Sequence, residues 1–147
     1  MALDEFSKVY STIFRYGYSG YSYSQLRRMF PEYNSQIVAN ALYQAFLFRR
    51  TILKTHNYPK KLNANVFLRS NDYKIKGNEV EIIYKPRNRI KLKVFPTEKQ
   101  IKLMKEAKVK GAYLVNKEDK WFLNVILEKE VEFPKEIKIF TFFQNPF

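Results

Sequence analysis

Apolar residues recur at helical spacing over the first third of the chain. Residues 3–16 carry one apolar stripe, which predicts an amphipathic helix. Ser22 and Gln25 have the spacing of a capping box and predict the start of a short second helix. A third apolar pattern runs from Ser35 to His56 and predicts the longest helix.

After Pro59 the apolar period changes from helical to alternating, which is typical of strands. The segments with this pattern are 66–70, 72–76, 80–84, 89–95, 108–131 as two strands joined by a charged turn, and 136–144. One helix near 97–107 interrupts them, with Thr97 and Gln100 as a capping box and Ile101, Leu103 and Met104 turned inward.

These elements together predict an α+β fold. We expect an N-terminal helical segment of about three helices, residues 1–57, packed on a mainly antiparallel sheet in residues 58–147. The sheet should have six or seven strands, as a barrel or a strongly curved sheet, with the one inserted helix. No long linker separates the segments, which favours one compact unit.

Composition narrows the class of protein. The 147 residues are 46% hydrophobic and 17% aromatic, which indicates a folded chain. No apolar run approaches the roughly 20 residues that span a bilayer, and the first residues do not resemble a signal peptide, so we expect a cytoplasmic protein with no membrane partner. The heavy use of Lys, Glu, Ile and aromatic residues suits a thermophile.

The net charge of +13 points to a polyanionic partner. Nucleic acid is the leading class and anionic lipid a distant second, although solubility explains part of such a charge. Residues 58–107 hold thirteen Lys/Arg and five Asp/Glu, which is the largest excess in the chain. The basic surface is therefore expected in the middle of the sequence.

Five basic residues within that region fall at every second position, and no acidic residue lies among them. They are Lys85, Arg87, Arg89, Lys91 and Lys93. In a strand this spacing places side chains on one face about 7 Å apart, close to a phosphate repeat, so the row could follow a nucleic-acid backbone. The alternative is the solvated face of an amphipathic strand. Further candidates for phosphate contacts are Arg49, Arg50, Lys108 and Lys110.

A glycine- and serine-rich stretch after the first helix is unusually rich in tyrosine. Its tyrosines and a neighbour are Tyr16, Tyr18, Tyr21, Tyr23 and Tyr33. Such rings can stack on unpaired bases, but rings near a helix connection more often pack on the protein. Arg49 and Arg50 have a similar alternative, since basic residues favour a helix end.

Catalytic arrangements are not evident in the sequence. There is no cysteine, His56 is the only histidine, and the three aspartates are Asp4, Asp72 and Asp119. A two-metal nuclease needs several converging carboxylates, and Asp119 beside Glu118 is better explained as a turn. We therefore expect no enzyme activity, no metal and no cofactor.

Several markers resemble the N-terminal part of OrfB/TnpB proteins of insertion sequences. They are Ala41 and Ala45, Pro59 with Lys60 and Lys61, Lys110-Gly111-Ala112, and Lys120-Trp121-Phe122. The resemblance covers about two thirds of the chain. It implies a recognition lobe and a wedge domain of a TnpB-like transposase, which hold guide RNA and target duplex.

Two departures limit what the resemblance implies. The family opens with a basic strand, whereas this chain starts in helix-like sequence. The nuclease domain that follows the tryptophan hairpin in the family has no counterpart here. The resemblance thus predicts a truncated or stand-alone module that binds RNA or duplex backbone without catalysis.

Two other hypotheses stay open. The second and third helices could form a helix-turn-helix that binds duplex DNA, with Gln36, Asn40, Tyr43 and Gln44 toward a major groove. Alternatively, the protein is a structural module or a homodimer joined through the edge strand at 136–144, with Phe140, Phe142 or Phe143 exposed.

Overall fold

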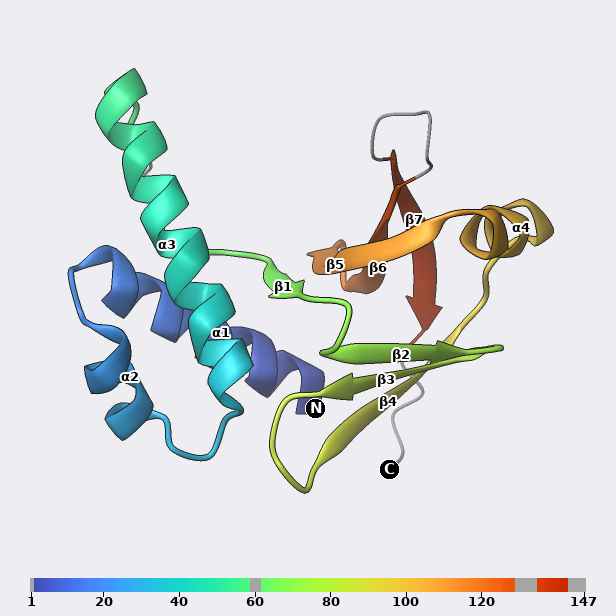
Figure 1. The fold of residues 1–147 in the computed structure, drawn as a ribbon, viewed down its shortest axis with the longest axis horizontal. Coiled ribbons are helices and arrows are strands. Elements are labelled where there is room, and N and C mark those ends of the chain that lie inside the picture. The colour runs from blue at the N-terminus through green and yellow to red at the C-terminus, as the bar shows by residue number, and fades with distance from the viewer. Residues whose placement is uncertain (1, 59–61, 129–134, 143–147) are drawn as a thin grey trace. The chain divides into compact units, whose positions relative to one another are not determined.

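The computed structural model describes residues 2–58 and 62–128, and the backbone of 135–142. It divides into two compact units (Figure 1). Unit 1 comprises Met1–Val66 and the loop Tyr84–Asn88, and unit 2 comprises Phe67–Ile83 and Arg89–Phe147. The helical unit is thus more extensive than the range 1–57, and it includes a loop between two strands.

Unit 1 contains three helices, as the periodicity predicts. They are α1 (Ala2–Tyr18), α2 (Tyr23–Met29) and α3 (Ser35–Thr55), and α3 is the longest at 21 residues. The stripe of α1 is buried and consists of Leu3, Phe6, Tyr10, Ile13 and Phe14. Burial of this stripe against α3 removes its apolar surface from water and stabilises the helical unit (Figure 1).

Small residues let α1 and α3 approach closely. A Cβ added to Gly17 would lie 3.0 Å from Leu42 Cδ1 and 3.2 Å from Ala45 Cβ. Ala41 and Ala45 are fully buried on α3. Their four-residue spacing therefore has a packing role, because larger side chains would push the helices apart.

Both predicted capping boxes are confirmed. The Ser22 hydroxyl accepts from the Gln25 amide at 3.2 Å, and the Gln25 side chain accepts from the Ser22 amide at 2.9 Å. The same pair of bonds joins Thr97 and Gln100 at the start of α4 (Glu98–Glu106). These reciprocal bonds fix where both helices begin.

Unit 2 is built on a sheet of seven strands. The strands are β1 (Val66–Leu68), β2 (Tyr73–Lys76), β3 (Glu79–Ile83), β4 (Arg89–Val94), β5 (Lys108–Lys117), β6 (Lys120–Glu128) and β7 (Lys135–Phe142). Their order is β1-β5-β6-β7-β4-β3-β2, and β1 continues directly from unit 1. Because β1 and β2 are the two ends of this order, the sheet is open. The α+β class is confirmed, and the sheet is not a closed barrel.

The β5–β6 hairpin explains two markers of the sequence. A Cβ on Gly111 would lie 2.9 Å from the Leu68 carbonyl oxygen, so glycine is required where β1 approaches β5. Trp121 is 4% exposed and contributes to the core of unit 2. Glu118 and Asp119 form the turn with φ of 55° and 63°, the left-handed conformation of a tight hairpin.

Two expectations about side-chain direction are wrong. None of the residues of α4 is buried, although Ile101, Leu103 and Met104 were expected to turn inward; Ile101 is 37% exposed. Tyr84 does not extend β3, which ends at Ile83; its ring instead packs in unit 1, 5.2 Å from the ring of Phe6.

Candidate nucleic-acid interface

The predicted row of five basic residues is divided between the two units. Lys85 and Arg87 lie in the Tyr84–Asn88 loop of unit 1, so the spacing of a strand does not apply to them. Arg89, Lys91 and Lys93 are exposed on β4, with buried residues between them. Only this second part has the alternation on which the phosphate hypothesis depends.

Lys85 contacts an acidic side chain and two aromatic rings within unit 1. Its Nζ lies 4.0 Å from Glu32 Oε2, 5.1 Å from the ring centre of Tyr33 and 5.5 Å from that of Tyr84. Desolvation, helped by the nearby Glu5, raises the pKa of Tyr33 to about 12, so the hydroxyl stays neutral beside the ammonium group. The Lys85 charge thus stabilises this cluster, whereas Arg87 is exposed.

On unit 2, three adjacent strands form what we call the charged sheet face. Its members are Lys74 and Lys76 on β2, Glu79 and Glu81 on β3, and Arg89, Lys91 and Lys93 on β4. The register places Glu81 between Lys74 and Lys91, and Glu79 between Lys76 and Lys93. The opposite face carries buried apolar residues such as Val80, Ile82 and Leu92.

The middle strand therefore places negative charge inside the basic row. Arg89 Nε lies 2.9 Å from Glu81 Oε1, and cross-strand neighbours have Cβ atoms about 5 Å apart. A phosphate that approached Lys91 or Lys93 would also approach a glutamate, which reduces the attraction. The alternation within β4 could not reveal this, because the register with β3 decides which charges become neighbours.

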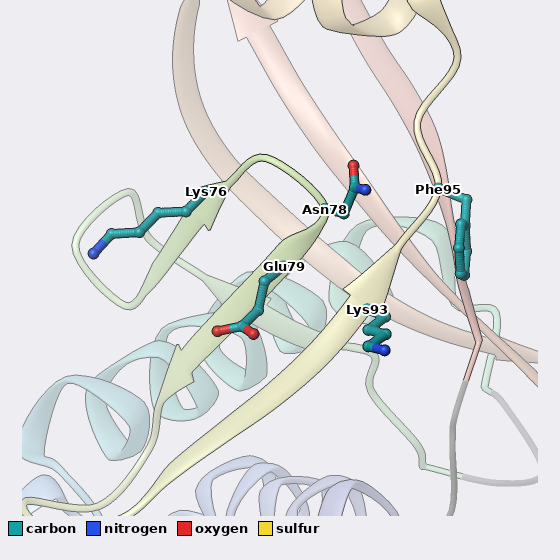
Figure 2. A pocket seen from close by; sticks show the side chains of 5 residues that line it. All are labelled: Lys76, Asn78, Glu79, Lys93 and Phe95. Atoms are coloured by element: carbon teal, nitrogen blue, oxygen red, sulfur yellow. The ribbon is translucent and has the colours of Figure 1, made fainter.

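A shallow cavity of about 400 Å³ lies at one end of the charged sheet face (Figure 2). Lys76, Asn78, Glu79, Lys93 and Phe95 line it. Phe95 is 53% exposed and adds an aromatic ring to this end of the face. The cavity combines two lysines with a glutamate, so its charge is again mixed.

The candidate phosphate-contacting residues on β5, Lys108 and Lys110, also have an acidic neighbour. Lys110 Nζ lies 3.2 Å from Glu128 Oε2, and Lys108 is the register partner of that glutamate. Both lysines are exposed. A single carboxylate on β6 thus neutralises part of the charge that the two lysines supply.

A different surface lies on α3, and the sequence reasoning missed most of it. We call it the α3 face; it consists of Tyr43, Phe46, Leu47, Arg50, Leu53 and Lys54, which recur at intervals of three and four residues. Phe46 is 59% and Leu53 63% exposed. The last turns of α3 project beyond α1 and α2 (Figure 1). The signal was present as a second apolar stripe on the same helix.

The charge of the α3 face is of one sign. Residues 33–58 contain no aspartate or glutamate. Arg50 and Lys54 are exposed and form no ion pair within the described part of the chain. Arg49 is also exposed. Its Nη1 donates to the Tyr18 carbonyl at 3.5 Å and so provides a hydrogen bond to a backbone carbonyl at the C-terminal end of α1.

The tyrosine-rich connection mainly packs on unit 1. The ring of Tyr16 lies 4.9 Å from that of Tyr21, and the ring of Tyr18 lies 5.9 Å from that of Phe48. Tyr33 is only 5% exposed. Tyr23 is 43% exposed and is the ring of this group most accessible to a base.

The helix-turn-helix hypothesis loses two of its four contact residues. Asn40 is 1% exposed, so it cannot reach a groove. The Gln44 side chain accepts from the Tyr10 hydroxyl and donates to the Asn65 carbonyl at 3.2 Å. Gln36 and Tyr43 are exposed.

The remaining predictions concern an edge-strand dimer, metal binding and the membrane. The side chains of Phe140, Phe142 and Phe143 lie outside the described residues, so the edge-strand dimer stays a prediction. Within residues 2–58 and 62–128, no group of three or more His, Asp or Glu residues is placed to hold a metal ion. Among the described helices, none has the length and apolar character needed to cross a bilayer.

Comparison with known proteins adds no family assignment. No protein-family model matches the chain, and the curated proteins include no significant match to it.

Proposed function

We propose that this protein binds single-stranded nucleic acid, RNA or DNA, without catalysing a reaction on it. The observation that carries the proposal is the α3 face, where Arg50 and Lys54 lie among exposed aromatic and aliphatic side chains with no acidic residue nearby in the sequence. Proteins that hold single strands combine basic side chains for the backbone with aromatic rings for the bases.

Charge and side-chain chemistry support this partner over the alternatives. A net charge of +13 concentrates polyanions near the surface, and Tyr43 and Phe46 offer rings on which unpaired bases stack. A base-paired duplex hides its base faces, so it cannot use these rings. The charged sheet face supplies weaker, less specific attraction. A cytoplasmic location accords with this partner.

A TnpB-like origin is a narrower proposal within the same class. Its support is the order of sequence markers, which includes Lys110-Gly111-Ala112 on β5 and Lys120-Trp121-Phe122 on β6 of one hairpin. On this proposal the protein is a recognition and wedge module that holds RNA. RNA from a transposon end, copurified from the native host and sequenced, would support it; random RNA would count against it.

The binding proposal is tested by fluorescence anisotropy with labelled single strands and the matching duplex over a series of KCl concentrations. For phosphate contacts by Arg50 and Lys54, the logarithm of the association constant should fall with the logarithm of salt at a slope of about −1.4, and weaker contacts elsewhere on the protein would make the slope steeper. The single strand should bind more tightly than the duplex. Affinity that does not change with salt, or a preference for duplex, would overturn the proposal.

A further inference from the structure

The α3 face is bounded at both ends of the helix. Toward the N-terminus of α3, the residues that precede Tyr43 on the same side are Ala39 and Gln36, which offer neither a ring nor a charge. Toward the C-terminus, the helix ends at Thr55, and His56 caps it in the left-handed conformation with φ of 55°. These limits decide how much of a nucleic acid the face can contact.

The length of the α3 face corresponds to a few nucleotides. An α-helix rises about 1.5 Å per residue, so the Cα atoms of Tyr43 and Lys54 lie about 16 Å apart along the helix axis. Stacked nucleotides of one strand lie about 3.4 Å apart, and a protein ring inserted between two bases doubles this separation to about 7 Å. The face therefore accommodates about three nucleotides whose bases stack on its rings.

The two basic residues of the face lead to the same count. Arg50 and Lys54 are both exposed, and their spacing of four residues places them about 6 Å apart along the axis. This distance is close to the separation of consecutive phosphates in an extended strand. Because two consecutive phosphates join three nucleosides, the charges also match a trinucleotide.

Rings and charges occupy different halves of the α3 face. Tyr43 and Phe46 lie in the N-terminal half, and Arg50 and Lys54 lie in the C-terminal half. The next tyrosine or phenylalanine in the chain, Tyr58, lies beyond the end of the helix. Proteins that coat long single strands provide a basic groove with a series of rings for successive bases. The α3 face has one such group, so a longer strand gains no further stacking on it.

We propose, as an extension of the single-strand proposal above, that the α3 face binds a short unpaired element of about three nucleotides, such as a loop, bulge or overhang. Two bases stack on Tyr43 and Phe46. The two phosphates that join the nucleotides contact Arg50 and Lys54. All four residues belong to unit 1, so the site is complete within one unit. Stacking accepts any base, so the element is selected for being unpaired and not for its sequence.

The test is fluorescence anisotropy of the full chain with labelled hexanucleotides in which abasic sites replace some of the bases. All members of the series carry the same phosphates, so the electrostatic attraction is constant and only the number of contiguous bases changes. Restoring the first three bases should strengthen binding about thirtyfold or more, the effect of two stacked bases. The remaining bases should add no more than about fivefold in total, because they only increase the number of registers in which a short site can bind.

Two variants locate the stacking. Tyr43→Ala with Phe46→Ala should remove the gain that the bases provide, and circular dichroism should show an unchanged fold because both side chains are exposed. Tyr58→Ala removes a ring that is 68% exposed but lies outside the helix, so it is the matched control and should leave the gain unchanged.

The outcomes separate this inference from the single-strand proposal. A steady increase in affinity up to the last base, a gain that persists without Tyr43 and Phe46, or a gain that is lost in Tyr58→Ala would overturn the short site on α3 and leave single-strand binding intact. Equal affinity for the natural and the fully abasic hexanucleotide would overturn both, because no base would then be stacked.

Discussion

Two surfaces of the molecule carry exposed basic side chains, and they differ in what lies between those charges. On the charged sheet face, Glu79 and Glu81 occupy the strand between the lysines of β2 and the basic residues of β4. On the α3 face, Arg50 and Lys54 lie among the exposed apolar and aromatic side chains of Tyr43, Phe46, Leu47 and Leu53, and none of the residues of the face carries a carboxylate. The number of basic residues in a segment therefore does not measure its attraction for a phosphate.

The difference also concerns stability. Cross-strand pairs of opposite charge each contribute about 0.2–1 kcal/mol to a sheet, so the charged sheet face has a structural role without any ligand. The exposed side chains of the α3 face contribute little to folding, because Phe46 and Leu53 are more than half exposed. Exposed apolar area that does not stabilise the fold is a signature of binding surfaces.

The largest expected effect is on the free energy of unfolding, when a buried and an exposed side chain are each truncated to alanine. Ile82→Ala, at a fully buried position beneath the charged sheet face, should lower the free energy of unfolding by about 2–5 kcal/mol. Leu53→Ala on the α3 face should change it by less than about 0.5 kcal/mol. Urea unfolding followed by circular dichroism measures both. Similar losses at the two sites would show that Leu53 is buried in solution.

The next effect concerns the aromatic rings of the α3 face. Tyr43→Ala with Phe46→Ala should weaken binding of single-stranded RNA or DNA by about 2–4 kcal/mol, since stacking contributes about 1–3 kcal/mol per base. Duplex binding should change little. Fluorescence anisotropy with a labelled single strand and the matching duplex measures the difference. Tyr18→Ala is not a suitable control, because the ring of Tyr18 packs on Phe48. Equal losses for the two substrates would contradict base stacking.

A smaller effect should come from the glutamates of the charged sheet face. Glu79→Gln with Glu81→Gln leaves five basic residues without acidic neighbours on those strands, so nucleic-acid affinity should rise about tenfold, or ~1.4 kcal/mol. Stability should fall by about 0.5–1 kcal/mol because the cross-strand pairs of opposite charge are lost. Glu118→Gln in the hairpin turn is the control. Unchanged affinity would indicate that phosphates never approach this face.

Local sequence signals predicted much of the fold. The capping boxes at Ser22 and Thr97 require only residues three positions apart, and the alternation of β4 follows from one strand alone. Such features are visible in sequence because their partners are neighbours in the chain.

The candidate site was less predictable because it depends on neighbours distant in sequence. Register brings Glu81 beside Arg89, and the Tyr84–Asn88 loop brings Lys85 to Glu32. Tertiary packing buries Asn40 in a helix where the pattern left it free to be exposed. The second apolar stripe of α3 was readable, but periodicity alone does not distinguish an exposed stripe from a buried one.

The most direct measurement compares two variants that remove the same charge. Arg50→Gln with Lys54→Gln alters the α3 face, and Lys91→Gln with Lys93→Gln alters the charged sheet face. Salt-dependent anisotropy with a labelled single strand should show the slope reduced by about 1.4 for the α3 pair and by less than about half of that for the sheet pair. An equal or larger reduction for the sheet pair would contradict the claim that the α3 face holds the nucleic acid.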